Sequence, residues 1–157
     1  MRQKTINVMG YIVNAASIGI FPCLVFKLDV PAPLRPLVIF GWVFLVLGIG
    51  LMASSLLALV RNGGGGLIEG GIYGIVRHPM YLGALLCFLS YVFFHPHWIT
   101  LLISLINGVI VYRFIRQGEK QNIETFGDAY RQYRRAVPQI NLFAGITRRL
   151  KTGKGRD

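Results

Sequence analysis

The chain is organised around Gly70-Gly71-Ile72-Tyr73-Gly74-Ile75-Val76-Arg77-His78-Pro79-Met80-Tyr81-Leu82-Gly83, and an apolar run follows Arg77-His78-Pro79. Proline is tolerated in the first turn of a helix, because its missing N–H would have no partner inside the helix there. We therefore expect a membrane helix to begin at Pro79, with Arg77 and His78 at its mouth, level with the lipid headgroups. The free N–H groups and partial positive charge of such a helix start, beside an arginine, suit an anionic group.

The composition around this stretch is that of a membrane protein. Of 157 residues, 54% are hydrophobic and only 15% are charged, whereas soluble domains carry about a quarter charged residues. The hydrophobic residues gather in long runs, which predicts an all-α, polytopic membrane helical bundle. We expect a single domain over 1–150, followed by a basic disordered tail at 151–157 that has almost nothing apolar to bury.

The apolar runs predict about four transmembrane helices, at 6–26, 37–60, 79–94 and from Trp98 to about Gln117. A proline-rich loop, 27–36, separates the first two. His95-Pro96-His97 joins the last two so tightly that they should form an antiparallel hairpin. We interpret these histidines as part of an interfacial turn and expect no metal site, because no cysteine or carboxylate lies nearby in the sequence.

The charge distribution predicts the topology. The net charge is +11, and 11 of the 17 Lys and Arg residues lie from Arg113 onward. Nucleic-acid binding is the alternative interpretation of such a tail, but this tail directly follows a membrane helix, where basic residues mark the cytoplasmic side and attract anionic lipid. Four spans would place 15 basic residues on one side and only Lys27 and Arg35 on the other. Both termini are therefore predicted to be cytoplasmic, in a multi-pass protein.

The region 119–135 reads as a basic, amphipathic cytoplasmic helical region with a break at Gly127. Its apolar and aromatic residues recur at three- and four-residue spacing and form one stripe: Ile123, Phe126, Tyr130 and Tyr133. Two interpretations stay open. The stripe can rest on the membrane surface, or it can fold back as a lid over a cofactor.

Two sequence blocks together resemble a known family. The first is Arg-His-Pro-x-Tyr-x-Gly at 77–83, preceded by a Gly-x-Tyr turn. The second contains Glu119, Phe126-Gly127, Tyr130, Tyr133 and Val137-Pro138. The pattern, which covers 67–142, resembles the isoprenylcysteine carboxyl methyltransferase and phospholipid methyltransferase family of integral membrane enzymes.

The resemblance implies the reaction and the cofactor. It implies methyl transfer from S-adenosylmethionine to a lipophilic, membrane-embedded acceptor of the isoprenylcysteine carboxylate or phospholipid amine type. C-terminal cytoplasmic helices would cap the cofactor pocket. The expected partners are the lipophilic substrate and membrane lipids, not nucleic acid. Metal chemistry is not implied, and no residue stands out as an obligatory catalytic base.

The resemblance also implies the cofactor contacts, which carry over to Leu67, Ile68, Tyr73, His78, Pro79, Met80 and Tyr81. Arg77, His78 and the helix start suit the methionine carboxylate of the cofactor. Glu119 suits its amino group. We expect His78 and Glu119 to lie at the cytoplasmic mouth of the bundle rather than among the packed helices.

The chain departs from the family pattern at two positions. Two adjacent acidic residues are usual where this chain has Gly118-Glu119, and many relatives have an arginine where it has Phe114. That arginine is associated with a prenylcysteine carboxylate, so its absence weakens this acceptor as the specific one. Two alternatives remain: an NADPH-dependent membrane reductase related to sterol reductases, and a non-enzymatic small membrane assembly protein.

Overall fold

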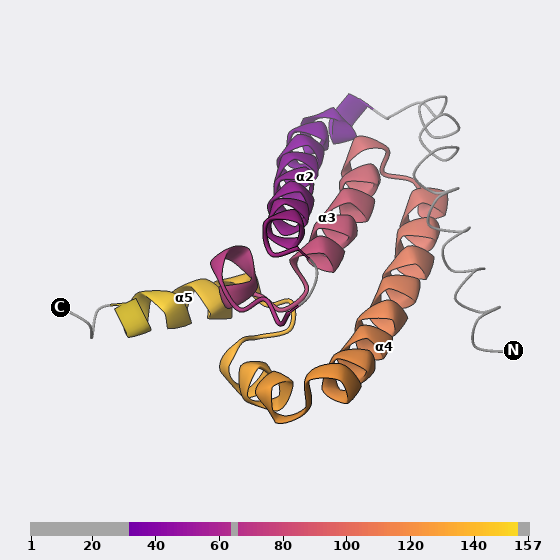
Figure 1. The fold of residues 1–157 in the computed structure, drawn as a ribbon. Helices are drawn as coiled ribbons and strands as arrows, with labels where there is room; N and C mark the ends of the chain where they lie inside the picture. The colour runs from indigo at the N-terminus through magenta and orange to yellow at the C-terminus, as the bar shows by residue number, and fades with distance from the viewer. Residues whose placement is uncertain (1–31, 64–65, 154–157) are drawn as a thin grey trace, which may run out of the picture. The chain divides into compact units, whose positions relative to one another are not determined.

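The computed structural model describes residues 32–63 and 66–153, and every regular element in that part of the chain is helical (Figure 1). In chain order the elements are the 3₁₀ helix η1 (Ala32–Leu37), α2 (Val38–Arg61), the 3₁₀ helix η2 (Gly71–Gly74), α3 (Pro79–Phe94), α4 (Trp98–Ala136) and α5 (Leu142–Gly153). The all-α class is confirmed for these residues. The helix expected at 6–26 lies outside them.

The helix starts agree closely with the sequence, but one helix end does not. α2 lies within one residue of its expected bounds, and α3 begins at Pro79 and ends at Phe94 as expected. α4 begins at Trp98 but runs on to Ala136, so the end expected near Gln117 is wrong. Losing apolar character does not end a helix, since the backbone hydrogen bonds continue until a cap or breaker intervenes. The one interruption within α4 is Gly127 (φ 56°, ψ −126°).

The two ends of the described chain also differ from expectation. The second half of the proline-rich loop, together with Leu37, forms η1, which includes Pro36. Short 3₁₀ turns are frequent at helix starts, and this one leads directly into α2. At the other end, α5 continues through Gly153, three residues past the point where we expected order to stop. Residues 154–157 lie outside the described part.

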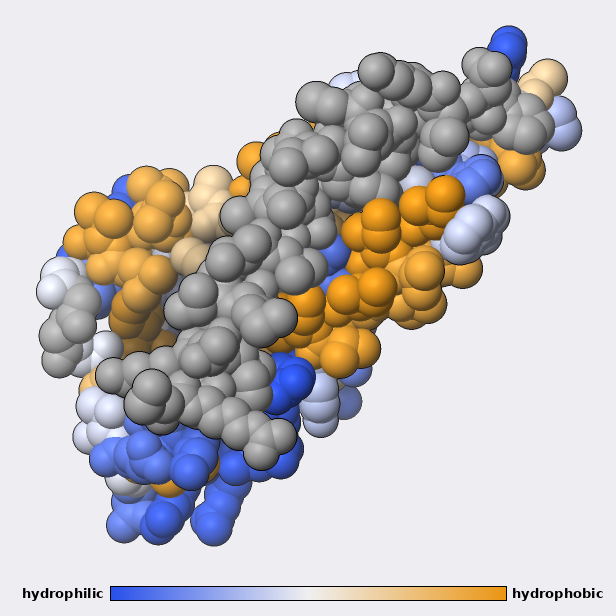
Figure 2. Space-filling view, turned by 90° about the vertical axis from the view of Figure 1, so that its right-hand side faces the viewer, coloured by the Kyte–Doolittle hydropathy of each residue, from blue (hydrophilic) through white to orange (hydrophobic). Residues whose placement is uncertain are grey.

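Two stretches are long and apolar enough to cross a membrane: Ala32–Arg61, which joins η1 to α2, and α4. The helix α3 is apolar but shorter. On the face drawn in Figure 2, hydrophobic and hydrophilic side chains gather in separate patches. Large apolar side chains of the two long helices are exposed, as lipid-facing residues would be: Ile39, Phe40, Trp42, Val43, Val46, Leu47, Ile49, Leu56, Leu57, Leu59, Val60, Trp98, Leu101, Leu102, Leu105, Ile106, Val109 and Tyr112.

The described chain divides into two compact units. The first contains 32–47 and Leu85–Arg113, and aromatic side chains hold it together. The ring of Trp42 packs edge-on against Phe94 at 5.2 Å, and Phe44 lies 5.2 Å from Phe93. The hydroxyl of Ser104 on α4 donates a 2.8 Å hydrogen bond to the carbonyl of Phe88 on α3.

The second unit contains 48–63, 66–84 and 114–153, and every residue of the candidate site lies within it. The second half of α2 and the first turn of α3 approach closely, since a Cβ at Gly83 would stand 2.6 Å from the carbonyl oxygen of Gly48. Small residues permit such backbone contact between helices. A small aromatic core of Tyr130, Tyr133 and Val137 packs against the segment that precedes η2.

Candidate functional site

Side chains of two helices hold the η2 turn. The hydroxyl groups of Ser55 on α2 and Tyr73 on η2 lie 2.7 Å apart. The hydroxyl of Tyr133 on α4 donates a 2.6 Å hydrogen bond to the carbonyl of Tyr73. Gly71 begins the turn at φ 58°, a conformation that glycine adopts without strain. The glycine-rich sequence around Tyr73 therefore makes a tight turn whose tyrosine is fixed at both its hydroxyl and its carbonyl.

The backbone of Arg77 and His78 is fixed by the chain that follows α4. The Arg77 N–H donates to the carbonyl of Pro138 (3.0 Å), and the His78 N–H donates to that of Gln139 (3.2 Å). The hydrogen bonds satisfy two donors just before α3 that have no partner inside that helix. The Val137-Pro138 part of the second sequence block thus positions the first block.

A buried charge cluster forms around Glu119, which is only 5% exposed. Its Oε1 pairs with Arg77 and lies 3.2 Å from His78 Nε2, while its Oε2 lies 3.4 Å from Arg134 Nε. His78 is 7% exposed. Both side chains are therefore packed inside the protein, contrary to the expectation that they lie apart from the packed helices, and Glu119 pairs with a residue 42 positions away. Their location at the cytoplasmic mouth stays a prediction.

Burial lowers the pKa of His78 below its ordinary value, although its contact with Glu119 works in the opposite direction and Arg77 adds to the lowering. The imidazole is therefore neutral at pH 7. We assign its proton to Nε2, because the Glu119 carboxylate beside that nitrogen can only accept a hydrogen bond.

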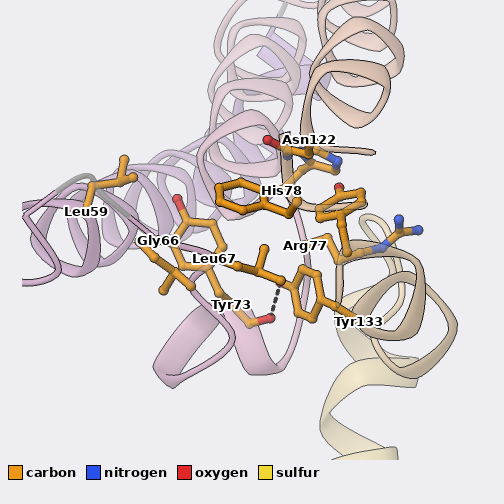
Figure 3. A pocket seen from close by; sticks show the side chains of 11 residues that line it. Leu59, Gly66, Leu67, Tyr73, Arg77, His78, Asn122 and Tyr133 are labelled. Carbon is orange, nitrogen blue, oxygen red and sulfur yellow. Dashed lines mark hydrogen bonds between the residues drawn. The ribbon is translucent and has the colours of Figure 1, made fainter. Parts of the chain in front are cut away.

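A cavity of about 210 Å³ lies beside this cluster. Figure 3 shows side chains from separate segments converging on it, with the Tyr133–Tyr73 hydrogen bond at one side. Eleven residues line it: Leu59, Gly66, Leu67, Ile68, Tyr73, Arg77, His78, Asn122, Phe126, Tyr130 and Tyr133. A second cavity of about 310 Å³ also has Tyr133 in its wall, together with Glu69, Gln132 and Arg148.

The aromatic stripe of α4 faces this cavity. Phe126, Tyr130 and Tyr133 are lining residues, and Ile123 packs against the same core. Tyr130 is 1% exposed, and its hydroxyl has no hydrogen-bond partner among the described residues. Arg77 Nε is likewise buried without a partner there. Buried polar atoms normally find partners, so two such atoms beside one cavity indicate a site that binds a polar ligand.

The expected site residues divide into three groups. Leu67, Ile68, Tyr73, Arg77 and His78 line the cavity. Glu119 contacts two of them without lining it. The remaining three belong to the first turn of α3 and do not line it: Pro79, Met80 and Tyr81. The Tyr81 ring packs 5.9 Å from that of His78, so it contacts a lining residue.

Sequence reasoning missed three lining residues: Leu59, Gly66 and Asn122. Asn122 precedes Phe126 by four residues and Tyr130 by eight, so helical spacing placed it on the aromatic stripe. Its polar character kept it out of an apolar pattern. Leu59 precedes the glycine run 63–66 and Gly66 is its last member, and no local signal marks either as a lining residue. No group of three His, Cys, Asp or Glu side chains within 32–63 and 66–153 is arranged to hold a metal ion.

Comparison with known families matches more than half of the chain, including nine of the eleven residues that line the cavity. A family model described as phospholipid methyltransferase matches residues 36–128. That range contains α2, η2, α3 and α4 as far as its break at Gly127. It includes the whole Arg-His-Pro block and Glu119.

Two curated relatives match parts of the chain. The protein-S-isoprenylcysteine O-methyltransferase of Schizosaccharomyces pombe is 36% identical over 90 residues, which cover 57% of this chain and 38% of the relative. Methanethiol S-methyltransferase 2 of Bradyrhizobium diazoefficiens is 37% identical over 82 residues, 46% of this chain and 28% of the relative. The matches therefore span less than two fifths of either relative. No solved structure is significantly similar to the chain.

Proposed function

Because the chain belongs to the phospholipid methyltransferase family, we propose that it transfers a methyl group from S-adenosylmethionine to a lipophilic acceptor in the membrane. One observation carries the proposal furthest. The two sequence blocks, far apart in the chain, converge on one cavity that has unpartnered polar atoms of Tyr130 and Arg77 beside it. If the two blocks only packed against each other, we would not expect buried polar atoms to remain without a hydrogen-bond partner beside the cavity.

The lining residues fit the parts of S-adenosylmethionine. Arg77 and the start of α3 would hold its carboxylate, which needs cationic or N–H donors. Tyr73, Phe126 and Tyr130 offer aromatic surface for the adenine, and the Tyr130 hydroxyl a hydrogen bond. A cavity of about 210 Å³ is smaller than the roughly 300–1,000 Å³ of most ligand pockets. The bound cofactor would therefore extend beyond it.

Glu119 would serve the cofactor's amino group together with its present partners. The amino-acid part of the cofactor carries a positive amino group and a negative carboxylate. It can therefore lie against an arginine–carboxylate pair with each charge opposite one of the other sign. Since Glu119 has no acidic neighbour at 118, it is the only carboxylate within this cluster among the described residues. We propose that it positions the amino group while Arg77 takes the carboxylate.

The sulfonium supplies an activated methyl group, so the protein's task is alignment and exclusion of water. The acceptor forms a bond to the methyl carbon as the carbon–sulfur bond breaks, and the electron pair of that bond stays on sulfur. A carboxylate acceptor needs no base. An amine or thiol acceptor must lose a proton, which the neutral His78 imidazole could take. The acceptor is proposed to be lipophilic, of the isoprenylcysteine carboxylate or phospholipid amine type.

The proposed architecture is a single methyltransferase-like domain over 1–150, in which four helices span the membrane and α3 and α4 form the last hairpin. Both termini would be cytoplasmic. The support is the pair of span-length helices, the contact of Ser104 with Phe88 near the α3–α4 turn, and the basic asymmetry of the sequence.

A titration tests the function. Detergent-solubilised protein should bind S-adenosylmethionine and its demethylated product, as measured by calorimetry, and should not bind NADPH. His78→Ala should weaken S-adenosylmethionine binding by about ten- to a hundredfold. His97→Ala, in the other unit, is the matched control and should not. Heat with NADPH alone would favour the reductase alternative, and folded protein that binds neither ligand would favour the assembly protein.

A further inference from the structure

One face of the C-terminal helix α5 packs against the rest of the protein. A Cβ built at Gly145 would lie 2.1 Å from the carbonyl oxygen of Ile75, so the helix backbone rests directly on the segment after η2. Arg148 and Arg149 flank that face and donate to the carbonyls of Gly74 (2.6 Å) and Gly71 (2.7 Å). These contacts fix which side of α5 is turned away from the protein.

The side turned away carries three large apolar side chains. Phe143, Ile146 and Leu150 are 83%, 40% and 69% exposed. At about 100° per residue they fall within an arc of roughly 60°, and Phe143 lies about 160° from Gly145. Apolar residues exposed by chance would be scattered around the helix. Three large apolar side chains on one exposed ridge instead indicate a binding surface.

The charges of α5 indicate what this ridge binds. The helix contains no acidic residue, and exposed Lys151 lies beside the ridge, about 80° from Phe143. Basic residues that flank an apolar face are the pattern of helices lying in the headgroup region of a bilayer. A second copy of α5 would bring like charges together, whereas an anionic lipid surface complements them.

We propose that α5 lies in the headgroup region of an anionic bilayer. Phe143, Ile146 and Leu150 contact the acyl chains, and Lys151 pairs with lipid phosphates. Because Arg148 and Arg149 join α5 to η2, the bound bilayer also steadies the turn that carries Tyr73. This inference does not depend on the reaction proposed above.

The experiment places the full chain in nanodiscs whose lipids carry brominated acyl chains, either neutral or containing phosphatidylglycerol. Tryptophan emission is recorded for Phe143→Trp and Ala144→Trp, each as a difference from the parent chain, which keeps Trp42 and Trp98. Both positions are exposed, but Ala144 lies about 100° around the helix from Phe143. The bromines should quench the added tryptophan at 143 and quench the one at 144 much less.

The lipid charge supplies a second measurement. Quenching at 143 should be stronger in phosphatidylglycerol nanodiscs, and the excess should fall with added salt and with Lys151→Gln. Emission at 143 that is typical of water and unquenched in both lipids would overturn the proposal. So would a shifted emission at 143 that persists in lipid-free amphipol and disappears on dilution, since that would show a second copy on the ridge.

Discussion

Glu119 is the residue on which the buried polar interactions of the site converge. Its partner Arg77 has a side chain only 8% exposed, whereas that of Arg134 is 47% exposed. The Arg134 contact is therefore screened by water and adds little. Removing Glu119 would leave the Arg77 charge buried and unpaired, so this carboxylate has a structural role in addition to any role in binding.

The consequence is a prediction about stability. Glu119→Ala should lower the free energy of unfolding by about 3–5 kcal/mol, the cost of breaking a buried ion pair by removing one partner. The double variant Arg77→Met/Glu119→Leu should lose much less, because neither charge remains. Denaturant unfolding in detergent measures both. Equal losses in the two variants would show that packing, not charge, explains the effect.

Two tyrosines make a matched test of ligand binding. The Tyr130 hydroxyl has no partner, whereas that of Tyr133 donates to the carbonyl of Tyr73. Tyr130→Phe should leave stability unchanged or higher and weaken S-adenosylmethionine binding by about two- to tenfold. Tyr133→Phe should lower stability by about 1–3 kcal/mol, because it leaves a carbonyl unsatisfied. If Tyr130→Phe binds like the parent, its hydroxyl does not contact the cofactor.

His78 gives the site a pH dependence. Burial lowers its folded-state pKa below the unfolded value of 6.5, so the unfolded chain binds more protons just below that pH. Stability therefore falls as the pH drops from about 6.5 towards the folded pKa and then levels off. The melting temperature of the parent should fall more steeply over this range than that of His78→Gln. If the melting temperatures of the two proteins fall equally with pH, His78 has the same pKa in the folded and unfolded states.

Some of the expected site residues are close in the sequence itself. Tyr73, Arg77 and His78 lie within six residues of one another, so their convergence on one cavity follows from the local chain. Their contact with the cofactor, which the family resemblance implies, stays a prediction. The pairing of Arg77 with Glu119 depends on tertiary packing between positions 42 apart. No periodicity reports such a pairing, so the sequence did not indicate that Glu119 is packed inside the protein.

Among the elements, α4 runs without interruption from Trp98 to the break at Gly127. Its aromatic stripe lines the cavity on both sides of that break. The sequence indicated the break at Gly127 but not the continuity between 113 and 119, because a change from apolar to charged residues resembles the end of a span. Of the two interpretations left open for the stripe, the lid is the one that the lining residues Phe126, Tyr130 and Tyr133 favour.

The glycines of α4 provide the test of that break. Gly127 has φ 56° and ψ −126°, a region that other residues rarely adopt, so Gly127→Ala should cost about 1–3 kcal/mol. Gly118 is helical, and nothing lies within 4 Å of a Cβ added there. Gly118→Ala should therefore stabilise the protein by roughly 0.5–1 kcal/mol. Thermal unfolding in detergent compares them, and two stabilising substitutions would show that α4 does not need its break.

The charges on either side of the long apolar stretch predict which side of the membrane holds the cavity. The stretch Ala32–Arg61 is long enough to span, and the segments beyond its two ends differ in charge. Beyond Arg61 come Arg77 and, further on, the 11 basic residues from Arg113 onward, whereas the 27–36 loop contains only Lys27 and Arg35. Because basic loops are retained in the cytoplasm, we predict that the Arg61 end is cytoplasmic.

Cysteine labelling of intact cells tests this orientation. Cys23 and Cys87 are first replaced by serine, and a single cysteine is introduced at the exposed positions Ala32 or Asn62. An impermeant maleimide should label Ala32→Cys, and it should label Asn62→Cys only after the cells are opened. The reverse pattern would place the Arg-His-Pro turn outside, away from cytoplasmic S-adenosylmethionine, and would overturn the proposed reaction. Equal labelling of both positions would mean that Ala32–Arg61 does not span the membrane, and the four-span arrangement would fall with it.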